Sequence, residues 1–258
     1  MRKIRVGVHL NPQHGTYADY KRAVLEVEQK GADVITVWDH FYPLSGDPDG
    51  KHYECWTLLS AIAAMTERIE MGPLVSAIGY RNPNLIADMS RTIDHISGGR
   101  FILGMGAGWS EKDYNQYGYE FGTVGSRLRD LRDSMPIIED RLSKLNPPPT
   151  RHIPIMIGGG GEKVTLRIVA KHADIWHANA GGDDLVRKAN VLKEWCEKEG
   201  RDPDSIEHAT GLAMAASLDE GDDMVDKGFT FLTIRCSGPE WDLSRFGDWI
   251  AWRDKRNA

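Results

Sequence analysis

Apolar residues follow two alternating patterns along this chain. Between residues 83 and 96 they recur every three or four positions, which predicts an amphipathic helix. These positions are Leu85, Met89, Ile93 and Ile96. After Gly98 and Gly99 comes a short continuous apolar run, residues 101–105, which is typical of a strand buried on both faces. Helix, glycine break and buried strand together form one unit of a parallel α/β fold.

The same unit recurs over the whole length. Apolar runs with strand character lie at residues 4–10, 34–38, 69–75, 101–105, 153–157, 174–177, 208–216 and 229–234. Helical patterns lie at residues 17–30, 56–66, 83–96, 126–145, 162–172, 183–199 and 243–255. Eight buried strands alternating with helices favour a closed (β/α)₈ barrel over an open doubly wound sheet, and we expect one domain over residues 1–258.

Two helical regions depart from a regular barrel. Pro136 lies inside the fourth helical pattern, so we expect either a kink or two abutting helices, with Ser134 capping the second. Only residues 219–227 separate the last two strands, too few for a full-length barrel helix. The barrel is therefore expected to be thin or irregular there.

Composition and charge exclude several classes of protein and leave the predicted fold unchanged. A formal net charge of −6 argues against a broad nucleic-acid or anionic-membrane surface. No apolar run approaches the ~20 residues of a membrane-spanning helix, and the first apolar run is too short for a signal peptide. The three cysteines have no metal-ligand spacing. We therefore expect a cytoplasmic protein with free thiols, no bound metal, and a small-molecule substrate.

Trp38, Asp39 and His40 follow the second predicted strand directly. Since ligands sit at the carboxyl ends of barrel strands, this Asp-His pair is well placed to face one. An equally simple interpretation is that Asp39 caps the next turn and His40 makes a local hydrogen bond. The residues alone leave both open.

Glycines mark two other strand ends. Gly106, Ala107 and Gly108 would let a planar ring approach the backbone closely, although a tight turn has the same pattern. A run of four (Gly158, Gly159, Gly160 and Gly161) opens a helix, where backbone N–H groups and the helix dipole suit a phosphate. This run is neither a P-loop nor a dinucleotide-binding fingerprint. Asn179, after the sixth strand, offers a further polar contact.

In this order and spacing, these motifs resemble the bacterial luciferase-like family, and within it the branch that uses coenzyme F420. The densest matches are residues 34–41, 72–109 and 153–176. The resemblance implies a (β/α)₈ barrel, here shortened after the fourth helix and at the seventh. It also implies a homodimer.

The resemblance assigns roles to individual residues. It implies that His40 lies at the reaction centre, with Asp39 beside the redox ring. It implies a non-proline cis peptide bond at or near Val75–Ser76, in a bulge that reaches Ala77 and faces the ring. Cofactor phosphate is expected at the run of four glycines. Trp38, Trp109 and Glu111 are expected in the substrate pocket. Sugar-phosphate dehydrogenases of the family have a carboxylate where this chain has Trp109, which argues against oxidation of glucose 6-phosphate.

The resulting hypothesis is hydride transfer between the deazaflavin of F420 and a small organic substrate. One alternative is a monooxygenase that uses reduced FMN and oxygen. An alternative from another class is a non-catalytic F420-binding protein, suggested by the shortened regions.

Overall fold

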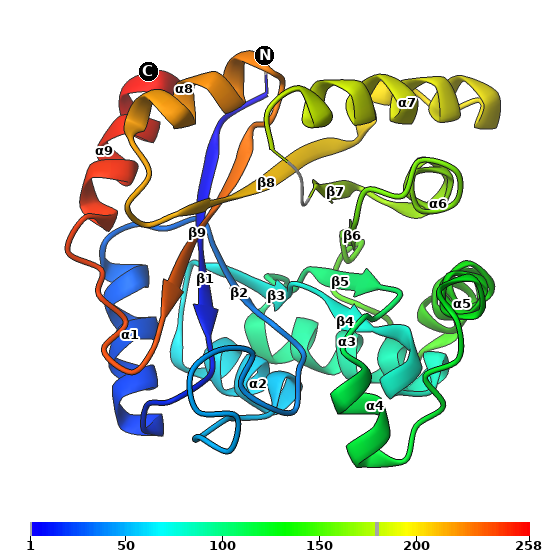
Figure 1. Ribbon diagram of the computed structural model, residues 1–258, viewed down its shortest axis with the longest axis horizontal. Helices are drawn as coiled ribbons and strands as arrows, with labels where there is room; N and C mark the ends of the chain where they lie inside the picture. The colour runs from blue at the N-terminus through cyan, green and yellow to red at the C-terminus, as the bar shows by residue number, and fades with distance from the viewer. Residues whose placement is uncertain (1, 179–180) are drawn as a thin grey trace.

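The computed structural model describes residues 2–178 and 181–258, and over these residues nine parallel strands form one curled sheet (Figure 1). The strands are β1 (Arg5–Asn11), β2 (Val34–Val37), β3 (Glu70–Pro73), β4 (Ser76–Ala77), β5 (Leu103–Gly106), β6 (Ile155–Gly158), β7 (Ile175–Ala178), β8 (Glu207–Ala213) and β9 (Phe231–Ser237). Their order in the sheet is β3-β2-β1-β9-β8-β7-β6-β5-β4.

The two ends of this sheet meet and close the barrel. The amide of Ile102, just before β5, donates to the carbonyl oxygen of Met71 in β3 at 2.8 Å. The backbones approach so closely that a Cβ added at Gly104 would lie 1.8 Å from the carbonyl oxygen of Pro73. Only glycine fits where the barrel closes.

The predicted third strand, residues 69–75, is shorter in the structure, and a second short strand follows it. β3 ends at Pro73 and β4 begins at Ser76, and the peptide bond between Leu74 and Val75 is cis. This is one residue before the position that the family resemblance indicated. The other seven predicted strands are found, with ends shifted by at most three residues.

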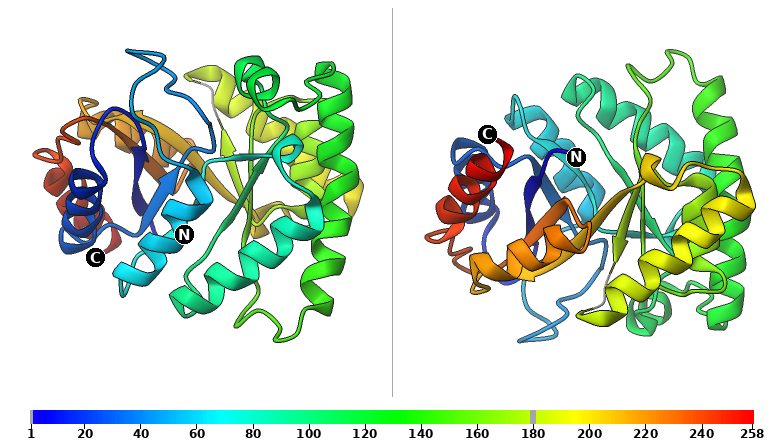
Figure 2. Two further views of the ribbon diagram at one scale, coloured as in Figure 1. Left: turned by 90° about the horizontal axis from the view of Figure 1, so that it is seen from below. Right: turned by 90° about the horizontal axis from the view of Figure 1, so that it is seen from above.

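Helices surround the barrel (Figure 2). They are α1 (Tyr17–Gln29), α2 (Cys55–Met65), α3 (Pro83–Ser97), α4 (Glu111–Tyr117), α5 (Val124–Lys144), α6 (Thr165–His172), α7 (Asp183–Glu199), α8 (Leu218–Asp226) and α9 (Phe246–Asn257). The expectation of two abutting helices at Pro136 is wrong, because α5 runs through it as one helix. Between β8 and β9 the chain has only the nine-residue α8, as its short spacing predicted. No described helix is long and apolar enough to cross a membrane.

Side chains fill the barrel interior toward the amino ends of the strands. Apolar side chains from six strand segments pack together inside it: Val34, Ile102, Met156, Ile175, Ala209 and Phe231. Beneath them, at the amino ends of the strands, Arg5 pairs with Glu70 and with Glu207, both at 2.5 Å. A larger apolar core packs the helices against the outside of the sheet. Only the carboxyl ends of the strands are left to form a site, as in other parallel barrels.

Candidate functional site

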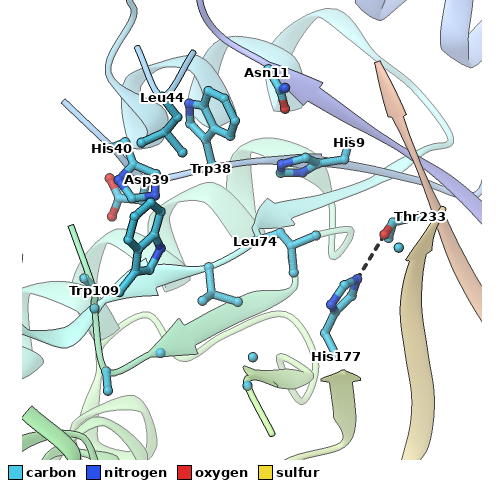
Figure 3. A pocket seen from close by; sticks show the side chains of 18 of the residues that line it. His9, Asn11, Trp38, Asp39, His40, Leu44, Leu74, Trp109, His177 and Thr233 are labelled. Atoms are coloured by element: carbon cyan, nitrogen blue, oxygen red, sulfur yellow. Dashed lines mark hydrogen bonds between the residues drawn. The ribbon is translucent and has the colours of Figure 1, made fainter. Parts of the chain in front are cut away.

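A cavity of about 710 Å³ opens at the carboxyl ends of the strands (Figure 3). This volume is within the range of small-molecule and cofactor sites. The structure brings most of the predicted site residues to its walls: Trp38, Asp39, His40, Val75, Ala77, Gly106, Ala107, Gly108, Trp109, Gly158 and Gly159. Ser76 is buried behind the wall, and Asn179 lies outside the described residues.

One side of the cavity is an apolar wall made by Leu74, Val75 and Ala77. Glycines next to it make room for Val75. A Cβ at Gly106 would lie 2.7 Å from Val75 Cγ2, and one at Gly158 would lie 3.0 Å from Val75 Cγ1. The sequence suggested that Gly106 admits a ligand ring and that Gly158 belongs to a phosphate-binding run. In the structure, both glycines leave room for Val75 of the protein's own bulge, and the bulge faces the cavity.

Asp39 sits at the centre of a buried polar cluster behind this wall. Its Oδ2 accepts hydrogen bonds from Arg81 at 2.5 Å, from the Ser76 hydroxyl at 2.7 Å and from Trp56 Nε1 at 3.3 Å. Arg81 also donates to Asp39 Oδ1 and to Glu54. The carboxylate is thus used to fix the bulge at Ser76, so its geometry is that of a structural anchor beside the cavity.

His40 is oriented by a carboxylate that sequence reasoning missed. Its Nδ1 lies 2.6 Å from Oδ2 of Asp113 in α4, which also accepts from the Tyr80 hydroxyl at 3.0 Å. Burial would raise the pKa of Asp113, but His40 together with hydrogen bonds from Ser110 and from the backbone of Phe41 outweighs burial and lowers it. Asp113 is therefore ionised and accepts a hydrogen bond from the Nδ1–H group of His40. This leaves Nε2 as the ring nitrogen available to a ligand.

Trp109 and Glu111 are placed differently. Trp109 is 65% exposed at the cavity mouth and packs edge-on against His40, with ring centroids 5.3 Å apart. Glu111 is exposed and does not line the cavity. The carboxylate that reaches the site is Asp113, two residues further along α4. Residues 111–117 are mostly polar and carry no helical apolar period, so no pattern in the sequence indicates this helix.

Two buried histidines, His9 of β1 and His177 of β7, face the cavity (Figure 3). His9 Nδ1 lies 2.9 Å from Thr36 Oγ1, and His177 Nε2 lies 2.9 Å from Thr233 Oγ1. Burial, with lesser contributions from His177 and Arg235, lowers the pKa of His9 to about 3. Burial lowers the pKa of His177 to about 4. Both rings are neutral near pH 7. Sequence analysis did not select them, although each interrupts an apolar strand.

These histidines predict acid-sensitive folding. Below their ordinary pKa of 6.5, both take up protons in the unfolded chain but remain neutral in the folded one. Acid therefore favours the unfolded chain, and stability should fall as the pH drops from about 6.5 to about 4, by up to ~1.4 kcal/mol per pH unit for each histidine. Urea unfolding across this range checks it, and His177→Asn should show a shallower slope. An equally steep slope in the variant would contradict the assignment.

The glycine run leads from the first cavity into a second one of about 470 Å³. Gly160 and Gly161 line the second cavity together with Lys163, Arg187 and Lys188, and Thr165 lines both cavities. Helix α6 begins at Thr165, so a turn separates the glycines from the helix. Cations supply the positive field here in addition to backbone groups, and this suits an anionic ligand. Among the described residues, no group of three or more His, Cys, Asp or Glu side chains could hold a metal ion.

Solved structures share this architecture. F420-dependent secondary alcohol dehydrogenase in complex with an F420-acetone adduct matches with a TM-score of 0.85 at 15% identity, over 98% of this chain and 99% of that one. The oxygenating constituent of 3,6-diketocamphane monooxygenase from Pseudomonas putida, in complex with FMN, matches with a TM-score of 0.65 at 17% identity, over 88% and 72%. At these identities the likeness is one of fold, and it confirms the predicted barrel.

Sequence relatives extend the likeness. An uncharacterized protein of Mycobacterium tuberculosis is 26% identical over 198 residues, 69% of this chain and 67% of that protein. F420-dependent glucose-6-phosphate dehydrogenase of Amycolatopsis mediterranei is 28% identical over 189 residues, 66% of this chain but only 54% of its own length. A family model described as luciferase-like monooxygenase matches residues 2–229. The chain therefore belongs to the luciferase-like monooxygenase family, as its sequence motifs predicted.

Proposed function

We propose that this protein is an oxidoreductase that transfers hydride between coenzyme F420 and a small organic substrate. The observation that carries the proposal is the His40–Asp113 pair, held at the wall of a cavity that also has an apolar bulge. The names of the dehydrogenase relative and of the alcohol dehydrogenase structure support it.

The described residues fit the shape and charge of this cofactor. Leu74, Val75 and Ala77 offer an apolar face for a planar ring. The second cavity adjoins the first at Thr165, and its cations Lys163 and Lys188 suit an anionic tail. When bound, the deazaflavin supplies or accepts the hydride.

The protein's own part in the chemistry is proton transfer and orientation. A substrate carbonyl that is reduced needs a proton at its oxygen, and an alcohol that is oxidised must lose one. His40 Nε2 is the group placed to give or take this proton, because Asp113 holds Nδ1. Trp109 and Trp38 flank the His40 ring and limit the approach of water to it.

Paired binding titrations with F420 and FMN test the proposal. Quenching of intrinsic tryptophan fluorescence should report both ligands, since Trp38 and Trp109 line the cavity. We expect micromolar affinity for F420 and much weaker binding of FMN. Lys188→Gln should weaken F420 binding because it removes a cation from the second cavity. Preference for FMN would instead favour the flavin monooxygenase, and binding of neither would overturn both assignments.

A further inference from the structure

We propose that the substrate of this site is a small carboxylic acid and that Arg235 binds its carboxylate. The inference deepens the proposed function, on which its redox step rests. The binding subsite itself consists of side chains at the carboxyl ends of β1 and β9.

The two strands place four polar residues side by side. In the parallel register of β1 and β9, His9 lies next to Arg235 and Asn11 lies next to Ser237. All four line the large cavity. In the strand order, β1 and β9 are far from β5 and β6 in both directions around the ring. This polar subsite therefore faces the cavity from the side opposite the glycine-rich strand ends.

Arg235 is a cation without a counter-ion in the part of the chain that the structure describes. It is exposed to the cavity, and no carboxylate among residues 2–178 and 181–258 lies within ion-pair distance of its guanidinium. The acidic residue that lines the same cavity, Asp39, is already paired with Arg81. His9 and His177, which also line the cavity, are neutral near pH 7. The polar side of the cavity thus carries an unmatched positive charge, which an anionic ligand would balance.

Asn11 independently indicates a ligand at the same place. Its side chain is 3% exposed, and its Nδ2 donates to Ser237 Oγ at 2.8 Å. Its Oδ1 is buried and has no hydrogen-bond partner within the described residues. A buried carbonyl oxygen left without a donor costs free energy, so a ligand that brings a donor here is favoured. The carboxylate of an acid satisfies Arg235, and a donor on the ligand other than the group that exchanges a proton with His40 satisfies Asn11.

The second cavity is another place where an anion could bind. Its charge pairs and its neighbours distinguish it from the Arg235 subsite. In the second cavity, Arg187 is already paired with Asp184 and with Glu162. That cavity also adjoins the glycine run, which the proposed function assigns to the cofactor tail. Arg235 lies on β9, which is next to β1, and β1 is next to β2, the strand that leads into His40. The acid is accordingly assigned to Arg235.

Calorimetric titration with matched acids and amides tests the inference. Lactate, 2-hydroxyhexanoate and mandelate would each be compared with the corresponding amide, which has the same shape without the charge. Both the free protein and the F420-loaded protein would be titrated. We expect at least one acid to bind about tenfold or more tighter than its amide. Arg235→Gln should remove this preference while leaving the affinity for F420 unchanged.

Two control variants locate the effect. Arg132→Gln removes one positive charge from the exposed surface of α5, where Arg132 pairs with its neighbour Asp133, and should keep the preference for acids. Lys188→Gln should weaken F420 binding but keep that preference. If the amides bind as tightly as the acids, or if Arg235→Gln retains the preference, the inference is wrong. Failure of F420 to bind the wild-type protein would instead contradict the proposed function, while titration of the free protein still tests the subsite.

Discussion

Replacing His40 with asparagine is expected to lower the turnover number by about 100- to 10,000-fold, the range for loss of a positioned general acid or base. Asparagine is polar and of similar size, but it cannot exchange a proton with the substrate. Turnover would be measured with the best substrate found in a screen, following the redox state of F420 by its absorbance.

Cofactor binding separates this loss of chemistry from a loss of structure. The affinity of His40→Asn for F420 should stay within about twofold of wild type, because the apolar wall and the second cavity are untouched. Asp113→Asn should also reduce turnover, since an amide no longer offers His40 Nδ1 a charged acceptor. Unchanged turnover in His40→Asn would exclude it as the proton-transfer group.

The second large effect is expected on stability. Asp39→Asn should lower the free energy of unfolding by about 3–5 kcal/mol, because it leaves the guanidinium of Arg81 buried without its bidentate partner. The substitution also weakens the hydrogen bond that the Ser76 hydroxyl donates to residue 39, so the bulge is held less firmly. Urea unfolding monitored by circular dichroism would measure the change.

Glu54 provides the matched control for this prediction. It also pairs with Arg81, at 2.7 Å, but its side chain is 40% exposed, compared with 1% for Asp39. Solvent screens such a pair, so Glu54→Gln should cost only about 1 kcal/mol. Equal losses in the two variants would show that burial does not decide the strength of this cluster.

Much of the fold could be predicted because each strand is a short apolar run bounded by glycine or polar residues. The break between β3 and β4 was not predicted, although Gly72 and Pro73 form a dipeptide typical of turns and β3 ends at Pro73, because the mostly apolar residues around them favour one continuous strand. Helix α4 was missed for the opposite reason. Its tyrosines pack in a small aromatic cluster of their own, and its other residues are largely polar.

The candidate site was predictable only where it follows strand ends. Trp38, His40 and the glycines were selected because the carboxyl ends of barrel strands converge. Asp113 reaches His40 from a helix 73 residues along the chain, a contact that only the folded structure reveals. His9, Asn11 and Arg235 did leave a signal. They are polar residues at alternate positions of β1 and β9, and the alternation points them into the barrel.

The packing around Val75 bears on how this protein can diversify. A side chain at Gly106 would collide with Val75 and one at Gly158 would crowd it, so a substitution at either glycine requires Val75 to shift. Arg235, across the cavity, has no such constraint, because its side chain is exposed to the cavity. A single substitution at Arg235 therefore changes the charge of the cavity without repacking, whereas a substitution in the opposite wall requires compensating changes.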